Sequence, residues 1–198
     1  MKTSEEMIEI TINSKELKFQ TDPVLFSPKA IDKGTFAMLS VVVFRPGDKV
    51  LDLGCGYGVV GVFAATTIGQ ENVIMCDISS QAVLCARENA ILNGVPKINV
   101  LESNGFAQIT DRDFTLILSN PPYHADFSVP KHFIEEGYKR LKFGGRLVMV
   151  TKRLEWYKRK FISVFGGVQI FRVDGYYVFV GEKRRKIGRD DEKRELSF

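Results

Sequence analysis

The sequence predicts an α/β domain built on a doubly wound, mostly parallel sheet. From residue 49 onward, short apolar runs alternate with stretches of helical spacing, which is typical of parallel strands joined by right-handed crossovers. Near the C-terminus two apolar runs flank Asp174-Gly175, a strong hairpin signal that adds one antiparallel strand. A length of 198 residues with 44% hydrophobic content fits one domain. We expect a β-hairpin extension over 1–30, the main domain over 31–183 and a charged tail over 184–198.

The expected elements follow from the apolar runs and the turn residues between them. Alternation at 7–12, followed by 17–20 after Asn13-Ser14, predicts a small β-hairpin. A helix is expected over about 34–44, ended by Pro46-Gly47. The other strands are expected at 49–53, 72–76, 98–101, 114–118, 146–150, 168–173 and 176–180, and the other helices at 59–68, 80–92, 132–141 and 153–165.

Composition excludes several classes of protein. No apolar run approaches the roughly 20 residues that span a bilayer, and residues 1–9 lack the apolar core of a signal peptide. Cys55, Cys76 and Cys85 are odd in number and form no C-x-x-C motif, which predicts reduced thiols and a cytoplasmic location. Two histidines without a ligand-spaced cluster argue against a metal site.

The stretch Leu51-Asp52-Leu53-Gly54-Cys55-Gly56-Tyr57-Gly58 joins a buried strand to a helix through a glycine turn. Free backbone N–H groups at such a turn are expected to face a ligand, and glycine permits positive φ and close approach. Gly56-x-Gly58-x-x-Gly61 satisfies the dinucleotide-binding pattern, with Asp77 about 20 residues later at the place of a ribose-binding acid. Asp52, however, suits a cationic ligand better than a pyrophosphate. The alternative is a turn that only connects strand and helix.

A second motif, Ser119-Asn120-Pro121-Pro122-Tyr123, directly follows the strand expected at 114–118. Ligands of doubly wound sheets sit beyond the carboxyl ends of the strands, where strand order reverses, so both motifs should open into one crevice. Pro121-Pro122 stiffens the loop, and Tyr123 offers a stacking face worth roughly 1–3 kcal/mol. The alternative is an ordinary loop after a strand.

These two motifs resemble those of class I S-adenosylmethionine-dependent methyltransferases. The segment from Asp52 to Gly58 looks like their motif I, and Asn120 to Tyr123 matches the (N/D/S)PP(Y/F/W) motif of enzymes that methylate nitrogen conjugated to a π-system. The resemblance implies a Rossmann-like, seven-stranded sheet with its last strand antiparallel, and S-adenosyl-L-methionine as cofactor. It also implies the catalytic set Asn120, Pro121, Pro122 and Tyr123. In that set, the side-chain oxygen of Asn120 and the carbonyl of Pro121 would accept from an amine with a delocalised lone pair.

The resemblance further implies cofactor-binding residues at the ends of the strands. Asp77 should accept from the ribose hydroxyls, and Ile78 should border the adenine. Asn104 stands where the family usually has Asp and should accept from the adenine amine. Asp32-Lys33-Gly34-Thr35 resembles a D-x-G-(T/S) segment that lies against the cofactor in one subgroup, although it is equally a plain helix start. The full set is Asp52, Gly54, Cys55, Gly56, Gly58, Asp77, Ile78, Asn104, Gly105, Asn120, Gly34 and Thr35; roles for Asp32 and His124 stay open.

Together these segments resemble the small-domain methyltransferases, whose best-known members make N2-methylguanine in ribosomal RNA. The resemblance runs from about residue 26 to 183. Those enzymes usually carry a second, degenerate copy of the domain, for which this chain has no room. The resemblance therefore points to the short, single-domain branch, whose substrates the fold does not specify.

Basic residues favour a nucleic-acid partner, since a surface of this kind follows phosphates. A solvated helical face is the alternative. We therefore expect an N-methyltransferase acting on an exocyclic base amine of ribosomal RNA, guanine N2 above all, without a membrane or metal partner. The alternatives are a protein glutamine N-methyltransferase, a small-molecule methyltransferase, and a non-catalytic module that binds the cofactor or RNA. The basic residues concerned are Lys139, Arg140, Lys142, Arg146, Lys152, Arg153, Lys158, Arg159, Lys160 and the cluster Lys183 to Lys186.

Overall fold

The computed structural model describes residues 6–21, 31–121 and 126–185. Its strands are β1 (Glu6–Ile12), β2 (Lys15–Thr21), β3 (Val50–Leu53), β4 (Val73–Asp77), β5 (Asn99–Glu102), β6 (Phe114–Ser119), β7 (Leu141–Thr151), β8 (Gln169–Val173) and β9 (Tyr176–Glu182). Its helices are α1 (Lys33–Val41), α2 (Val59–Ile68), α3 (Ser80–Leu92), α4 (Ser128–Arg140) and α5 (Glu155–Phe165), with one 3-10 turn, η1 (Gln70–Asn72).

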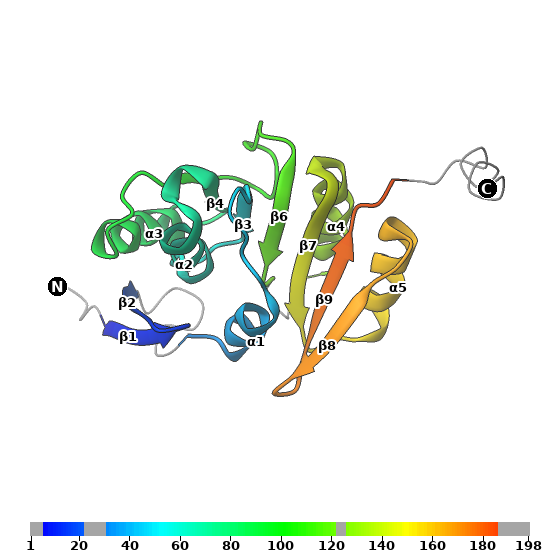
Figure 1. Cartoon of the computed structure of the whole chain (residues 1–198), viewed down its shortest axis with the longest axis horizontal. Coiled ribbons are helices and arrows are strands. Elements are labelled where there is room, and N and C mark those ends of the chain that lie inside the picture. The colour runs from blue at the N-terminus through cyan, green and yellow to red at the C-terminus, as the bar shows by residue number, and fades with distance from the viewer. Residues whose placement is uncertain (1–5, 22–30, 122–125, 186–198) are drawn as a thin grey trace, which may run out of the picture.

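Seven strands form one mixed sheet in the order β5-β4-β3-β6-β7-β9-β8 (Figure 1). Strand order reverses between β3 and β6, which pair in parallel at the centre of the sheet. β9 runs antiparallel to both of its neighbours. The predicted fold class is therefore confirmed: a Rossmann-like doubly wound sheet whose last strand is reversed. The carboxyl ends of β3 and β6 meet at the reversal, where ligands of such sheets bind.

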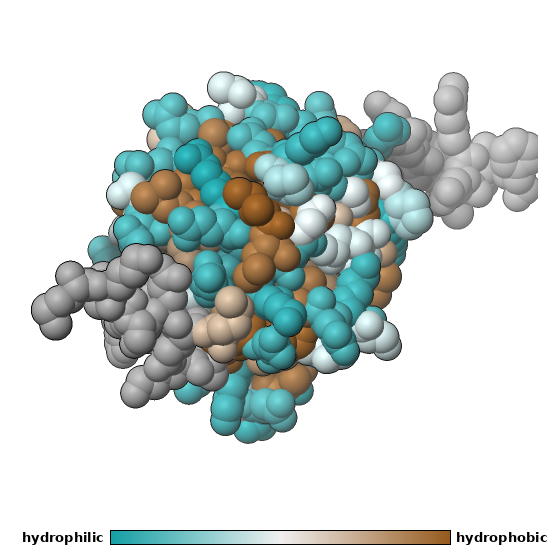
Figure 2. Space-filling model, turned by 90° about the vertical axis from the view of Figure 1, so that its left-hand side faces the viewer, coloured by the Kyte–Doolittle hydropathy of each residue, from teal (hydrophilic) through white to brown (hydrophobic). Residues whose placement is uncertain are grey.

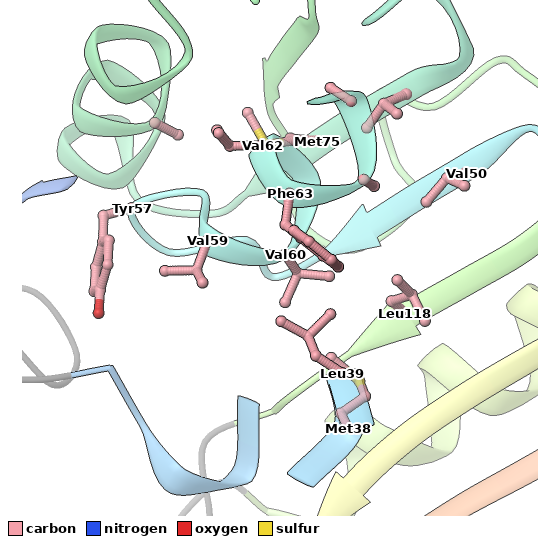
Figure 3. Packing of buried hydrophobic residues seen from close by; sticks show 14 of the residues in the cluster. Met38, Leu39, Val50, Tyr57, Val59, Val60, Val62, Phe63, Met75 and Leu118 are labelled. Carbon is pink, nitrogen blue, oxygen red and sulfur yellow. The ribbon is translucent and has the colours of Figure 1, made fainter. Parts of the chain in front are cut away.

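The central strands are buried on both faces because helices cover the sheet on each side. Residues of β3 and β6 alternate between two apolar clusters, with Val50 in one and Leu51 in the other. The first cluster includes residues of α1, α2 and α3, and the second includes residues of α4 and α5. Figure 3 shows the first cluster, in which Leu39 of α1 points toward Val60 of α2, with Leu118 of β6 beside them. Helix α1 is thereby fixed beside the carboxyl end of β6.

The predicted N-terminal hairpin forms a separate two-stranded sheet that docks on α3. Asn89 of α3 is fully buried and both accepts from the N–H of Gln20 (2.7 Å) and donates to its carbonyl (2.9 Å). Its side chain also donates to the carbonyl of Tyr57 (2.8 Å). Asn93 repeats the pattern with both backbone groups of Lys18. One buried amide thus joins the hairpin, α3 and the glycine turn.

The same side of the molecule carries a narrow band of apolar surface among hydrophilic side chains (Figure 2). The exposed apolar residues of α3 are Leu84, Ile91 and Leu92. Docking of the hairpin therefore covers only part of the apolar surface of this helix.

The largest differences from the predicted boundaries are at α4, at β7, and at α1, which ends at Val41 and not at 44. Helix α4 begins at Ser128, not at 132, because Pro130 falls in the first turn, where a missing N–H costs no intrahelical bond. Gly144-Gly145, expected to end that helix, lies inside β7, where both glycines bond to the backbone of Lys183. A Cβ on Gly145 would lie 2.7 Å from the carbonyl oxygen of Phe114, so glycine is needed there. The expected charged tail lies almost entirely outside the described residues.

Candidate active site

The backbone N–H groups of the glycine turn are bonded to β4. Those of Gly54 and Cys55 both donate to the carbonyl of Cys76 (2.8 and 2.9 Å), and that of Gly56 donates to Oδ2 of Asp77 (2.9 Å). For these three N–H groups, the expectation that they face a ligand is wrong. A pyrophosphate needs free donors at such a turn. With these three donors occupied and carboxylates beside them, the turn fits an uncharged or cationic ligand better than a dinucleotide.

Asp52 lies beneath the first turn of α2, with only 3% of its surface exposed. Its Oδ2 accepts from the N–H of Gly61 at 2.8 Å. Burial, aided by the nearby charge of Asp77, raises the pKa of this carboxyl to about 7 despite the opposing effect of the Gly61 hydrogen bond. A cation placed beside Asp52 would reverse this shift by favouring the ionised form.

Glycines of the turn serve two different purposes. Gly54 and Gly56 have positive φ, and a Cβ on either would find no protein atom within 4 Å, so both border open space. A Cβ on Gly58 would lie 3.2 Å from Cβ of Ala86, and one on Gly61 only 2.2 Å from Sδ of Met75. The first pair leaves room for a ligand, whereas the second pair lets α2 pack closely on its neighbours.

The loops after β4 and β5 are joined at the same edge of the sheet. Oδ1 of Asp77 accepts from the N–H of Ser79 (3.0 Å), and its backbone carbonyl accepts from the N–H of Ser103 (2.8 Å). Ser79 caps α3; the sequence allowed either Ser79 or Ser80 in that role. Ile78 is 66% exposed beside this junction, and Asn104 is exposed just beyond it.

An open cavity of about 670 Å³ lies between the loop after β5 and helix α4. Asn104 and Phe106 line it from the loop, and His132 and Arg140 line it from the helix. The Phe106 ring meets the His132 ring edge-on (6.2 Å between centroids) and lies 5.7 Å from the Arg140 guanidinium. Gly105 is buried behind them, and a Cβ there would lie 3.1 Å from the His132 ring. The volume is in the range of small-molecule sites.

Asn120 stands at the carboxyl end of β6, with its amide held from one side. Its Nδ2 donates to Oδ2 of Asp32 (2.8 Å) and to Oγ1 of Thr35 (3.1 Å), both at the start of α1. Its Oδ1 is buried and has no hydrogen-bond partner among the described residues. Beside it, Ser119 donates to the carbonyl of Leu53 (2.7 Å) and so ties the end of β6 to the glycine turn.

The structure places the predicted site residues at one edge of the sheet, the carboxyl ends of β3, β4, β5 and β6. Gly34 and Thr35 are buried in the first turn of α1. Pro121 is buried next to Asn120. Pro122, Tyr123 and His124 lie outside the described residues, so the predicted stacking face stays a prediction.

Sequence reasoning missed two polar contacts that shape the site. Asp32, whose role was open, contacts Asn120 across 88 positions of sequence; the D-x-G-T pattern was its only local signal. Asn89 was missed as well, although a polar residue on the apolar face of a predicted helix could have drawn attention to it.

Several basic residues expected to follow phosphates are instead bonded within the fold. Two pair with carboxylates, which offset their charge locally, whereas the others donate to neutral backbone carbonyls and keep their charge. These are Lys139 with Glu136, Lys160 with Glu135, Arg140 with the carbonyls of Ile109 and Asp111, Arg146 with the carbonyl of Val43, and Lys183 with the carbonyl of Leu141.

Arg153 is exposed and follows the end of β7, at the edge of the sheet where the candidate site lies. Met149 of β7 pairs with Ser119, the residue before Asn120, so the chain after β7 emerges beside the Asn120 loop. The Arg153 guanidinium lies 4.9 Å from the Phe127 ring centroid, and that ring stacks on Trp156 at 4.6 Å. Stacking holds the guanidinium near the site with its planar face covered.

Neither a metal cluster nor a membrane-spanning helix is found in the part of the chain that the structure describes. No three His, Cys, Asp or Glu side chains among those residues are grouped to hold a metal ion. None of their helices combines the length and apolar character required to cross a membrane.

Comparisons with known proteins agree with this geometry. The sequence model of the family described as "Methyltransferase small domain" matches residues 16–180. A ribosomal RNA small subunit methyltransferase C of Pseudoalteromonas atlantica is 33% identical over 151 residues, which cover 74% of this chain and 43% of that protein. An uncharacterized protein of Bacillus subtilis, YbxB, is 27% identical over 92% of this chain and 94% of its own length.

Among solved structures, a 16S rRNA N2 methyltransferase (RsmC) of T. thermophilus, in complex with AdoMet and guanosine, superposes with a TM-score of 0.84. It is 26% identical, and the match covers 92% of this chain and 52% of that one. The chain thus spans about half the length of the ribosomal RNA methyltransferases that it matches.

Proposed function

The chain belongs to the methyltransferase small domain family, and from that membership we propose that it methylates an exocyclic amine of an RNA base, guanine N2 above all, with S-adenosyl-L-methionine as donor. The observation that carries the proposal is the buried Oδ1 of Asn120, an acceptor without a partner among the described residues. A buried acceptor in that state favours a ligand that brings an N–H donor. The relatives named as ribosomal RNA methyltransferases support the choice of an RNA base.

The residues at the strand ends fit this donor. Asp52 provides a buried carboxyl with a raised pKa, whose ionised form a bound cation would favour, and Gly54 and Gly56 border open space. Each carboxylate oxygen has two acceptor sites, so Asp77 still has capacity for ribose hydroxyls while it holds the N–H groups of Gly56 and Ser79. We assign the adenine to the exposed side of Ile78 and to Asn104. The remaining proposed contacts are Cys55, Gly58, Gly105, Gly34, Thr35 and Asn120.

Bound in this crevice, the donor supplies a sulfonium methyl group: the amine lone pair forms the new N–C bond, the C–S bond breaks with its electrons going to sulfur, and the nitrogen then releases a proton to solvent. Oδ1 of Asn120 and the carbonyl of Pro121 accept from the two amine hydrogens. Because the nitrogen becomes positive during transfer, both hydrogen bonds strengthen in the transition state. This chain's residues therefore act by positioning and by electrostatic stabilisation, without a covalent intermediate.

The test is methyl transfer from radiolabelled S-adenosylmethionine to ribosomal RNA, to protein extract and to small metabolites in parallel. We expect label in RNA that digests to N2-methylguanosine. Asn120→Ala should lower kcat by about 10²- to 10³-fold, the loss typical of removing one such hydrogen-bonding group. Asn93→Ala is the matched control, since it removes an Asn that bonds to the hairpin.

Label confined to protein would overturn the RNA assignment and favour glutamine methylation. Tight donor binding without transfer to any acceptor would favour a non-catalytic module. We also infer a cytoplasmic location, where ribosomal RNA is modified and where thiols such as the three free cysteines persist.

A further inference from the structure

We propose that Asp32 and Thr35 are positioning residues, which hold the Asn120 amide with its oxygen toward the amine to be methylated. The inference rests on the proposed function and extends it to residues that touch neither methyl group nor base. It starts from an ambiguity of asparagine: the oxygen and nitrogen ends of its amide have nearly the same shape. A rotation by half a turn about the last side-chain bond exchanges them.

The contacts of Asn120 allow only one of these orientations. A carboxylate accepts hydrogen bonds and cannot donate them, so Oδ2 of Asp32 at 2.8 Å must face the nitrogen. The rotated amide would set its oxygen against the carboxylate and lose a charge-assisted bond. Oγ1 of Thr35 accepts from the same nitrogen at 3.1 Å.

These two bonds use both hydrogens of Nδ2, because a primary amide has two. Asn120 therefore has no donor left for a substrate, and only its buried oxygen is available. A base that presents an N–H₂ group completes the arrangement, whereas a base that presents a carbonyl oxygen at that point leaves two acceptors facing each other. The pair Asp32 and Thr35 thus makes the site selective for an amino group.

Asp32 also acts through its charge. A carboxylate bonded to the nitrogen end of an amide polarises it and draws negative charge onto the oxygen end, as in other hydrogen-bond chains. The amine becomes positive during methyl transfer, so this polarisation stabilises the transition state more than the bound substrate. We therefore expect the effect in kcat more than in KM.

If Asp32 had a purely structural role, variants that keep the helix cap would also keep the wild-type kcat. Asp32 is the N-cap of α1 and accepts from the N–H of Thr35 at 3.2 Å. Asn, Ser and Asp cap helices about equally well, so Asp32→Asn and Asp32→Ser keep the cap. Neither keeps a charged group that can only accept.

The experiment compares matched variants in single-turnover methylation of ribosomal RNA. We expect Asp32→Asn and Asp32→Ser to lower kcat about 10- to 100-fold, with KM for RNA, donor affinity and melting temperature close to wild type. Thr35→Val removes the hydroxyl acceptor at nearly constant volume and should lower kcat several-fold. Thr35→Ser retains the hydroxyl and should therefore keep most of the wild-type kcat.

A second readout needs neither donor nor RNA. In the free protein, the side-chain amide signal of Asn120, assigned by its disappearance in Asn120→Ala, should be shifted downfield and protected from solvent exchange. Asp32→Asn should reduce both the shift and the protection. A signal at the position and exchange rate of exposed asparagines in the wild type would overturn the proposed geometry.

The outcomes separate the two proposals. Wild-type kcat in the Asp32 and Thr35 variants, with Asn120→Ala inactive, would overturn the positioning role and leave the proposed function intact. Absence of methyl transfer to RNA by the wild type would overturn the proposed function, while the amide signal would still decide whether Asp32 fixes the Asn120 side chain.

Discussion

At the scale of single residues, the buried Asp52 lowers the stability of the folded chain at neutral pH, and in the proposed function it favours binding of a cationic donor. Its carboxyl is buried and its folded-state pKa of about 7 lies above the usual value of 3.8. The folded chain therefore holds a proton that the unfolded chain has lost between pH 4 and 7. Stability from this group is greatest below about pH 4, falls as pH rises to about 7 and is constant above it. A residue that weakens the fold at neutral pH is typical of functional sites.

We predict that Asp52→Asn raises the melting temperature at pH 8 and weakens binding of S-adenosylmethionine. Asn removes the buried charge, and its amide oxygen can still accept from Gly61. At 1.4 kcal/mol per pKa unit the gain at pH 8 has an upper bound on the order of 4 kcal/mol. At pH 4 the wild-type carboxyl is largely protonated, so the two proteins should melt close together. Thermal denaturation at both pH values and calorimetric titration of the donor measure the two effects; a larger gain at pH 4 would contradict the assignment.

At the scale of elements, the hairpin depends on one buried amide. Asn89 holds both backbone groups of Gln20 and the carbonyl of Tyr57. Because Tyr57 belongs to the glycine turn, the hairpin and the turn share an anchor. Loss of the Asn89 side chain should therefore also affect the glycine turn of the candidate active site.

We predict that Asn89→Ala destabilises the protein by about 2–4 kcal/mol, since it leaves buried backbone groups without partners. Amide hydrogen exchange in β1 and β2 should accelerate, and donor affinity should fall with it. Asn93→Ala, at the more exposed C-cap of the same helix, should cost less and leave donor affinity unchanged. Equal effects of the two substitutions would show that the Tyr57 contact has no consequence.

The elements that could be predicted from sequence are those defined by local pattern. Helix α2 and the glycine turn before it were predicted correctly because a buried strand, glycines and an apolar helix follow each other directly. The start of β7 was not, because it depends on pairing of Gly144 and Gly145 with Lys183, about 40 residues away. The occupied N–H groups of the turn escaped prediction for the same reason, since their acceptors lie on another strand.

The site could be predicted in part from topology. Both motifs follow central strands of a doubly wound sheet, so their meeting at one edge required no knowledge of side chains. The bond between Asp32 and Asn120 required the position of α1, which is set by packing of Met38 and Leu39 on the core. No local pattern encodes that position.

At the scale of the whole molecule, two exposed arginines, Arg153 and Arg184, lie near opposite ends of the sheet. Arg153 lies beyond the carboxyl end of β7, beside the Asn120 loop. Arg184 follows β9, whose Glu182 pairs with Arg146 near the opposite end of β7. An RNA strand that enters the site should contact the first of these and not the second.

We predict that Arg153→Gln raises KM for RNA and lowers its salt dependence. For each phosphate that the protein no longer neutralises, the slope of log KM against log salt concentration should fall by roughly 0.7–0.9. Arg184→Gln, the matched control at the far end, should leave the slope unchanged. A change of slope in Arg184→Gln alone would place the RNA on the opposite edge of the sheet.

The hydrogen bonds that fasten Gly56 and Ser103 to Asp77 have one more consequence. Because these hydrogen bonds already fix the conformation of the glycine turn and of the loop after β5, we expect little further ordering of either loop when the donor binds. Product release should likewise require little change in these loops. The difference in affinity between the donor and its demethylated product should then depend mainly on their difference in charge. Transfer of the methyl group from the proposed donor would convert a sulfonium cation into a neutral thioether, so we expect Asp52 to attract the product less strongly than the donor.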